Sequence, residues 1–186
     1  ADGWQVHACC RQPQSANSLD DLASNPRLAI HKLDVRDAQS ISMLSHALAD
    51  TPIDLLINNA GISTDRQRQD FGAIDYEDWS HVLDVNTLGP YRVSIALTNQ
   101  VANSERRQMV NISSALGSIE QYTTGGHYIY RSSKAALNMV TVNLAHDLRS
   151  RGITVLSVHP GWVRTDMGGS NAAISTQTSA AGLRRL

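Results

Sequence analysis

The order of apolar segments constrains this chain more than any other feature of its sequence. Short apolar runs alternate with longer amphipathic stretches, which is the pattern of the β-α-β units that build a parallel sheet. The runs are mostly continuous rather than alternating, as in strands that are covered on both faces. Five strands are therefore predicted, at residues 5–10, 28–33, 53–58, 109–113 and 154–159.

Between these runs, apolar residues recur at helical spacing in the segments 37–49, 75–101 and 130–149. Gly152 follows the last segment, as expected for a residue that ends a helix in the left-handed conformation. Parallel strands joined through helices predict an α/β fold, a doubly wound parallel sheet with helices on both faces. Such sheets bind ligands beyond the carboxyl ends of their strands, so the candidate site lies there.

Composition excludes several classes of protein. With 186 residues and a formal net charge of -1, the chain is predicted to form one domain without the basic surface that nucleic acid needs. No stretch approaches the length of a membrane-spanning apolar segment. The two cysteines, Cys9 and Cys10, are adjacent and form no disulfide framework, which indicates a reducing, cytoplasmic compartment.

Small and amide-bearing residues follow the third predicted strand. The run Asn58-Asn59-Ala60-Gly61 suits a place where backbone approaches a flat ligand closely, because larger side chains would collide with it. A simple turn is the alternative, since Asn and Gly are common turn residues. Two polar segments, 64–70 and 168–179, are predicted to be a surface loop and a mobile loop near the site.

A second set of polar residues follows the fourth predicted strand. Ser113 and Ser114 end that strand, and Tyr130 precedes Lys134 by four residues, which places both on one face of a helix. A nearby ammonium lowers the pKa of a phenol toward the range of an acid-base catalyst, and a serine hydroxyl stabilises charge on a carbonyl oxygen. Composition alone predicts about 0.05 such Tyr-x-x-x-Lys pairs, so the pair is not expected by chance.

Two other kinds of site have weaker support in the sequence. His127 and Ser114 form a conceivable hydrolase pair, but no G-x-S-x-G turn surrounds the serine. The seven histidines show no short ligand spacing such as H-x-x-x-H, and adjacent cysteines are poorly placed to share a zinc ion. We therefore expect no metal site.

The motifs stand together as NNAG at 58–61, Asn86 within DVNTLGP, NISSALGS at 111–118, YRSSK at 130–134 and HPGWVRTDMGG at 159–169. In this combination and order the chain resembles the short-chain dehydrogenase/reductase family, in particular the carbonyl reductases of the C-factor and sniffer kind. The resemblance covers essentially every residue. It implies a Rossmann-like fold in a single domain spanning 1–186 that is incomplete at both ends.

The resemblance also implies catalytic roles for four residues. Tyr130 would be the general acid in the reduction direction, and Lys134 would lower its pKa and hold the nicotinamide ribose. Ser114 would orient the substrate carbonyl. Asn86 would lie in a break of its helix and hold a water that relays protons to Lys134, and the Gly-Pro pair at 89–90 is consistent with such an irregularity.

The family's nucleotide cofactor implies a second group of residues. Besides Tyr130 and Lys134, the resemblance assigns to it Asp34 and Val35 beside the adenine, Asn58, Ala60 and Gly61 on the ribose side, and Pro160, Gly161, Val163 and Thr165 at the nicotinamide end. Arg11 follows the first predicted strand, where NAD-dependent relatives tend to carry an acidic residue. A guanidinium there can pair with a 2′-phosphate, so we expect NADP rather than NAD. A solvated surface charge is the alternative for Arg11.

One family feature is missing from the sequence. In this fold a central strand and a glycine-rich turn that binds the pyrophosphate precede everything seen here. Without that strand, its two neighbours would face a gap with unpaired backbone groups. Each such group costs roughly 1 to 3 kcal/mol, so a whole strand of them would exceed the roughly 5 to 15 kcal/mol of stability that a domain usually has. We therefore expect the sequence to be a fragment of a longer polypeptide. A folded, cooperative protein with an intact mass near 20.2 kDa would contradict this.

The expected function is NADP(H)-dependent reduction of a carbonyl to an alcohol, with a small-molecule carbonyl or alcohol as substrate. Relatives are commonly oligomers, so a homodimer or homotetramer is expected. A non-catalytic or signalling protein, whose truncated cofactor site does not turn over, is the alternative from another class. Dehydration or epimerisation on the same fold also stays open.

Overall fold

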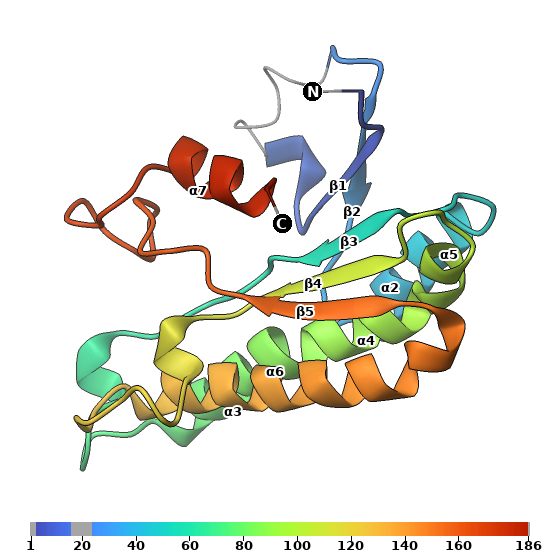
Figure 1. The fold of residues 1–186 in the computed structure, drawn as a ribbon. Coiled ribbons are helices and arrows are strands. Elements are labelled where there is room, and N and C mark those ends of the chain that lie inside the picture. Colours follow the sequence, from blue (N-terminus) through green and yellow to red (C-terminus); the bar gives the residue numbers. More distant parts are fainter. Residues whose placement is uncertain (1–2, 16–23, 186) are drawn as a thin grey trace.

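Parallel strands carry the fold of residues 3–15 and 24–185, which are the residues that the computed structural model describes (Figure 1). All five predicted strands are confirmed, with ends that move by at most two residues. They are β1 (Val6–Cys10), β2 (Leu28–Lys32), β3 (Leu55–Asn58), β4 (Gln108–Ile112) and β5 (Thr154–Val158).

The strands form two separate parallel sheets. One has the order β1-β2, with Val6 opposite Leu28, and the other has the order β3-β4-β5, with Asn58 opposite Asn111 and Asn111 opposite Ser157. Within the described residues no ladder joins β1 to β3. This is the arrangement that the sequence predicts when a central strand of a doubly wound sheet is lacking.

Helices flank the strands, and most of them lie on one face. Figure 1 shows α3, α4 and α6 beneath the three-stranded sheet and α7 on its other side. The helices are α2 (Ala38–Ala47), α3 (Tyr76–Leu83), α4 (Gly89–Ala96), α5 (Thr98–Ala102), α6 (Tyr128–Asp147) and α7 (Thr176–Leu183), with a π-helical turn η3 (Asp84–Leu88) between α3 and α4. Short 3-10 turns add η1 (Pro13–Ser15), η2 (Arg66–Arg68), η4 (Ala115–Gly117) and η5 (Arg149–Arg151). Among the described helices, none has the length and apolar character needed to cross a bilayer.

Side-chain caps determine where several helices begin. The Asp37 carboxylate accepts hydrogen bonds from the backbone N–H groups of Gln39 and Ser40 at the start of α2, and Asp75 caps α3 in the same way. Gly152 has the expected left-handed conformation, with φ of 71°, although it closes the turn η5 rather than α6 itself. These local signals are visible in the sequence.

Two predictions about helices need correction. The segment 75–101 is not one helix, because the π-helical turn and a cap at Leu97 divide it. The segment 168–179 is not all loop, because α7 begins at Thr176. The Ser175 hydroxyl caps α7 by accepting from the Thr178 N–H at 3.1 Å, which a run of Ser and Thr residues conceals in sequence.

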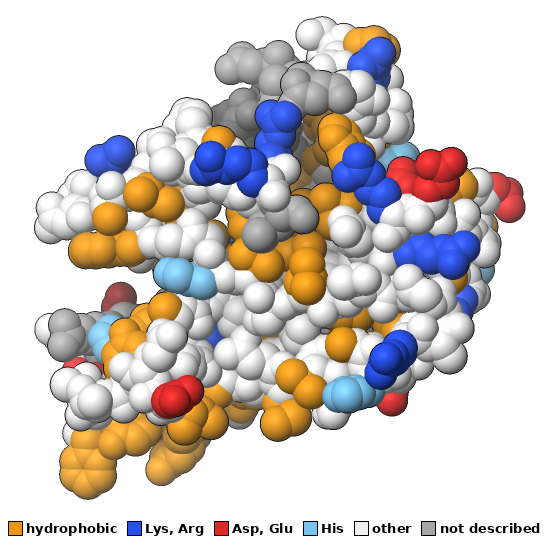
Figure 2. Space-filling view, viewed as in Figure 1, with side chains coloured by type: hydrophobic (Ala, Val, Ile, Leu, Met, Phe, Trp, Pro, Cys, Tyr) orange, Lys and Arg blue, Asp and Glu red, His pale blue; other side chains and the backbone are white. Residues whose placement is uncertain are grey.

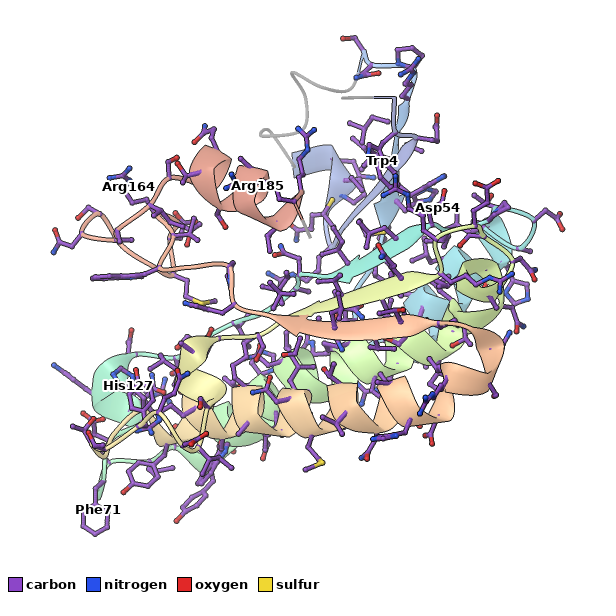
Figure 3. All side chains as sticks on the ribbon, viewed as in Figure 1. Trp4, Asp54, Phe71, His127, Arg164 and Arg185 are labelled. Atoms are coloured by element: carbon purple, nitrogen blue, oxygen red, sulfur yellow. The ribbon has the colours of Figure 1, made fainter. Side chains whose placement is uncertain are left out.

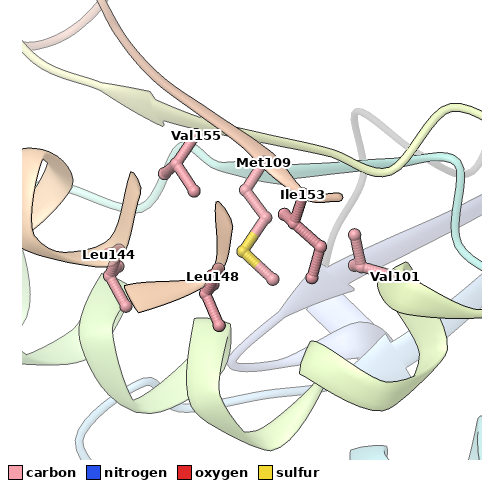
Figure 4. Packing of buried hydrophobic residues seen from close by; sticks show 6 residues of the cluster. All are labelled: Val101, Met109, Leu144, Leu148, Ile153 and Val155. Carbon is pink, nitrogen blue, oxygen red and sulfur yellow. The ribbon is translucent and has the colours of Figure 1, made fainter. Parts of the chain in front are cut away.

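Two apolar clusters hold these elements together. Val101, Met109, Leu144, Leu148, Ile153 and Val155 pack between β4, β5, α5 and α6 (Figure 4). The second cluster lies between α2 and α4, and its margin includes Leu33 after β2 and Leu56 of β3, so it links the two sheets. Each fully buried side chain of this size contributes about 1.5 to 3 kcal/mol of stability.

Candidate active site

The carboxyl ends of β3, β4 and β5 face an open hollow in the molecular surface. Figure 2 shows this hollow between an upper lobe, made of α7 and the loop before it, and a lower lobe of loops beside the start of α6. His127 of the lower lobe and Arg164 of the upper lobe are labelled on the two sides in Figure 3. The fold therefore brings the predicted strand-end residues to one edge, where ligands of such sheets bind.

Tyr130 occupies the first turn of α6, next to the strand end that carries Ser114. Burial raises the pKa of the Tyr130 phenol above its ordinary value of 10, while a hydrogen bond with the Ser114 side chain lowers it by less. A raised pKa keeps the phenol protonated at neutral pH. The pair can therefore present a proton donor beside a second hydroxyl, which is what reduction of a carbonyl needs.

Lys134 lies one helical turn after Tyr130 and is almost fully buried. Its Nζ donates to the Ile112 carbonyl oxygen at 2.8 Å and lies 5.8 Å from the ring centroid of Tyr130. Burial lowers the pKa of Lys134 from 10.5 to about 8. The sequence predicts a lowered pKa for Tyr130, but desolvation of the phenol is the largest effect in the structure, so the net pKa is raised.

Asn86 lies at the centre of the π-helical turn, so the expected break in its helix is confirmed. Its side chain is fully buried and makes three hydrogen bonds. Oδ1 accepts from the Ile62 N–H at 2.8 Å, and Nδ2 donates to the Ile62 carbonyl at 2.9 Å and to the Ser133 hydroxyl at 3.0 Å. Both amide hydrogens are thus used to tie the strand-end backbone to α6, a structural role that the sequence did not predict.

The Asn58 side chain is directed toward β4 and α4. It is 7% exposed, and its Nδ2 donates to Asn111 Oδ1 at 2.8 Å and to the Ser94 hydroxyl at 3.0 Å. Asn111 in turn donates to the Thr141 hydroxyl of α6 at 2.9 Å. The Asn58 side chain therefore fastens β3 to β4 and α4, and only its backbone is left for a nucleotide.

Residues predicted for the adenine side do meet in one place. A cavity of about 220 Å³ is lined by Arg11, Asp34, Val35, Ala60, Gly61 and Ile62 together with Arg36, His81 and Val85. A Cβ at Gly61 would lie 3.4 Å from Asn86 Oδ1 and 3.5 Å from Lys134 Nζ, so this backbone runs directly past these two side chains. Gly61 thus connects the lining of this cavity with Asn86 and Lys134, two of the residues predicted for proton transfer.

The charge in this cavity favours an anion. Arg36 holds the Asp34 carboxylate through Nη2 and Oδ2 at 3.1 Å and through Nε and Oδ1 at 3.3 Å, which keeps the pKa of Asp34 below its ordinary value. With that carboxylate neutralised, the positive charge of Arg11 is left over. Two guanidinium groups and one carboxylate suit a phosphate group better than a sugar hydroxyl alone. Arg36 was not predicted, because an Arg two residues after Asp resembles an ordinary surface charge.

The residues predicted for the nicotinamide end lie on the loop after β5. Gly161 has φ of +87°, and a Cβ there would come within 2.5 Å of Ile174. The Pro160 carbonyl accepts from the Ser179 hydroxyl at 2.7 Å, and Val163 forms a bridge with Ile174. The Thr165 hydroxyl accepts from the Gly168 N–H at 3.2 Å. These contacts fix the loop against α7, above the hollow.

Asn138 hydrogen-bonds to three separate segments, a role that the sequence does not predict. Its Oδ1 accepts from the hydroxyls of Ser113 and Ser157, both at 2.7 Å, and its Nδ2 donates to the Gly117 carbonyl at 3.2 Å. One amide on α6 therefore joins the ends of β4 and β5 to the turn that follows Ser114. An Asn on a helix carries no signal for such a role, since its partners come from other segments.

Gly117 sets how closely the turn after Ser114 approaches α6. A Cβ at this position would lie 2.8 Å from the backbone carbon of Lys134 and 3.0 Å from its carbonyl oxygen. We expect Gly117→Ala to lower the free energy of unfolding by about 1 to 3 kcal/mol, because helix backbone must move to admit the methyl group. Denaturant titration measures this. Gly182→Ala in α7 is the control, since nothing lies within 4 Å of its Cβ, and equal losses in both variants would contradict the argument.

Comparisons with known proteins agree with this arrangement. A family model described as short chain dehydrogenase matches residues 1–174. The protein C-signal of Myxococcus xanthus is 41% identical over 135 residues, which are 73% of this chain and 80% of that protein. Among solved structures, the carbonyl reductase Sniffer of D. melanogaster superposes with a TM-score of 0.90 at 34% identity, over 97% of this chain and 79% of that one. A carbonyl reductase from Pseudomonas aeruginosa PAO1 in complex with NADP gives a TM-score of 0.85 at 33% identity, over 99% and 80%.

Proposed function

The chain belongs to the short-chain dehydrogenase/reductase family of oxidoreductases, and from that premise we propose that it is an NADP(H)-dependent carbonyl reductase. The observation that carries this proposal is the grouping of Ser114, Tyr130 and Lys134 beside the backbone of Gly61 at the strand ends. The similarity to solved carbonyl reductases, including one with NADP, supports it.

When bound beside the lining of the adenine-side cavity, NADPH would supply the hydride for the carbonyl carbon. Tyr130 donates its phenolic proton to the carbonyl oxygen, so that the products are an alcohol and the oxidised cofactor. Ser114 holds the same oxygen while negative charge develops on it. The Lys134 ammonium stabilises the phenolate left on Tyr130. Its pKa of about 8 is close enough to neutral pH for Lys134 to pass a proton onward.

The segments that follow β4 and β5 also bear on the choice of substrate. Ile119, Trp162 and Met167 are exposed apolar side chains on the segments that follow β4 and β5. Neither segment carries the cluster of basic residues that would select an acid or a phosphate. We therefore propose an uncharged carbonyl compound as substrate.

Two wider properties belong to the same proposal. Exposed apolar side chains lie on the long helices, namely Leu88, Tyr91 and Ile95 near and on α4 and Met139 and Val142 on α6, and they favour a homodimer or homotetramer packed through these helices. Cys9 and Cys10 are both free thiols, which favours a reducing, cytoplasmic setting.

The test is NADPH oxidation, followed by absorbance, against a panel of uncharged aldehydes, ketones and quinones, together with a fluorescence titration of NADPH. Turnover of at least one carbonyl with NADPH supports the proposal. The similarity to a protein named C-signal favours one alternative, a non-catalytic or signalling member of the family. NADPH binding without turnover of any carbonyl would favour that alternative, and absence of NADPH binding would overturn the proposed cofactor.

We expect Arg11 to determine the preference of the protein for NADPH over NADH. Its charge is the one left over in the adenine-side cavity, and a charge-assisted hydrogen bond to a 2′-phosphate is worth about 1.5 to 3 kcal/mol. We expect Arg11→Asp to raise the Kd of NADPH by about 10- to 100-fold and to leave the Kd of NADH within a few-fold, as measured by titration. Arg27→Asp is the matched control, because Arg27 is also exposed but precedes β2, at the opposite end of the strands. Equal increases in the Kd of NADPH and of NADH would show that Arg11 does not bind the 2′-phosphate.

A further inference from the structure

The helix that carries Tyr130 begins without a cap of its own. His127 stands at the cap position in a left-handed conformation, with φ of 52° and ψ of 36°, and its side chain makes no capping hydrogen bond. The first hydrogen bond within the helix runs from the Arg131 N–H to the His127 carbonyl at 2.9 Å. The preceding N–H groups, including those of Tyr128 and Tyr130, therefore need partners from elsewhere.

Gln69 supplies those partners from a segment far away in sequence. Its backbone carbonyl accepts from the Tyr128 N–H at 3.0 Å, and its side-chain Oε1 accepts from the Tyr130 N–H at 3.2 Å. Its Nε2 donates to the Thr64 carbonyl at 2.9 Å, which fixes the amide in place. Gln69 is only 2% exposed, although the segment 64–70 was predicted to be a surface loop.

Neighbouring contacts strengthen this cap. The Asp70 carboxylate accepts from the His127 N–H at 3.2 Å, so two consecutive residues hold the start of α6. At the other end of the same segment, the Asn86 side chain holds both backbone groups of Ile62. The backbone from Ile62 to Asp70 thus runs from the lining of the adenine-side cavity to the first turn of the helix that bears Tyr130.

We infer that Gln69 is a positioning residue for Tyr130, an inference that rests on the proposed role of Tyr130 as the proton donor. The hydrogen bond is made to the amide of Tyr130 itself, so Gln69 fixes the backbone from which the phenol projects. His127, the N-cap residue, has a left-handed conformation that glycine prefers, and its side chain does not cap the first turn of α6. Displacement of a reacting group by about 1 Å can cost up to about 10²-fold in rate.

The test compares three variants of the segment. Gln69→Leu removes both side-chain hydrogen bonds at similar size, Gln69→Glu keeps the acceptor for Tyr130 but loses the donor to Thr64, and Gln67→Leu makes the same change at an exposed position two residues away. We expect Gln69→Leu to lower kcat by about 10-fold or more with little change in the KM for NADPH. Gln69→Glu should recover part of kcat, because its carboxylate still accepts from the Tyr130 N–H at the helix N-terminus, although it has no donor for the Thr64 carbonyl. Gln67→Leu should match the wild-type protein.

Several outcomes would overturn the inference. A folded Gln69→Leu protein with wild-type kcat would do so, and so would a Gln69→Glu variant no better than Gln69→Leu. If Gln69→Leu does not fold, Gln69→Asn replaces it, since the shorter amide stays polar but withdraws the acceptor, and an unchanged kcat then overturns the proposal. Wild-type protein that reduces no carbonyl would overturn the proposed function, and the role of Gln69 would fall with it.

Discussion

We expect Tyr130→Phe to lower kcat/KM for carbonyl reduction by about 10²- to 10⁴-fold, the range that a positioned general acid contributes. The substitution removes only the phenolic oxygen, so the ring stays beneath the Lys134 ammonium, which lies 5.8 Å from its centroid. Steady-state kinetics of NADPH oxidation measure the loss. The Kd of NADPH should change by no more than a few-fold, because the adenine-side cavity is untouched.

Tyr128→Phe is the matched control for this experiment. Tyr128 lies in the same first turn of α6, is partly exposed, and keeps its backbone hydrogen bond to the Gln69 carbonyl whether or not it has a hydroxyl. We expect it to retain wild-type kcat/KM. Equal losses in the two variants would point to disturbance of the helix start, and a fully active Tyr130→Phe protein would contradict the assignment of Tyr130 as the acid.

The raised pKa of Tyr130 determines which form of the phenol is present at neutral pH. Since burial raises this pKa, the phenol stays protonated throughout the neutral range, and we attribute the proton donor to this form. An acid with a raised pKa suits reduction, whereas the oxidation of an alcohol needs the phenolate. The upward shift of the Tyr130 pKa is therefore compatible with the reduction that we propose.

Local signals made much of the fold predictable from the sequence. The five strands are predictable because continuous apolar runs of this length, flanked by polar residues, are typical of buried strands, and Asp37 and Asp75 mark helix starts through side chains that bond to their own neighbours. Tyr130 and Lys134 stand out because helical spacing alone brings them together. Each of these inferences uses contacts between residues that are close in sequence.

What the sequence concealed depends on contacts between distant segments. Gln69 is polar in a polar run, yet it is buried because α6 needs acceptors that its own start does not provide. The motif marks Asn58 as a ligand residue, yet its amide is bound to Asn111 of β4 and to Ser94 of α4. The π-helical turn could be expected only from the family motif, and the change of sign for the Tyr130 pKa only from its burial.

The second large effect concerns Lys134, which contributes to the proposed reaction at a cost to stability. Its ammonium lies 5.8 Å from the centroid of the Tyr130 ring, and at a charge separation of about that size the Coulomb energy between an ammonium and a phenolate is roughly 3 kcal/mol at an effective dielectric constant of about 20. We therefore expect Lys134→Met to lower kcat for carbonyl reduction by about 10²-fold. Steady-state kinetics at pH 7 measure this, and Lys32→Met on β2 is the control, because it removes the only other lysine in the sequence. A Lys134→Met protein with wild-type kcat would contradict the assigned role.

The same substitution should change how stability depends on pH. Burial lowers the pKa of Lys134 from 10.5 to about 8, so between these pH values the unfolded chain binds more protons than the folded one, and wild-type stability rises with pH in that window. At about 1.4 kcal/mol for each pH unit, the buried charge costs about 3 kcal/mol at pH 7 and nothing above pH 10.5. The Lys134→Met protein lacks this cost at every pH, but it leaves the Ile112 carbonyl without its 2.8 Å partner, a loss of about 1 to 3 kcal/mol that does not vary with pH.

The difference in the free energy of unfolding between the wild-type and Lys134→Met proteins therefore measures the cost of burying the Lys134 charge. Wild-type free energy of unfolding minus that of Lys134→Met should increase by about 3 kcal/mol from pH 7 to pH 10.5, as measured by denaturant titration at each pH, because other titrating groups contribute equally to both. A difference that stays flat across this range would mean that Lys134 is solvated in the native state. Lys134 would then be fully charged at neutral pH, and its role would reduce to stabilising the phenolate without passing a proton onward.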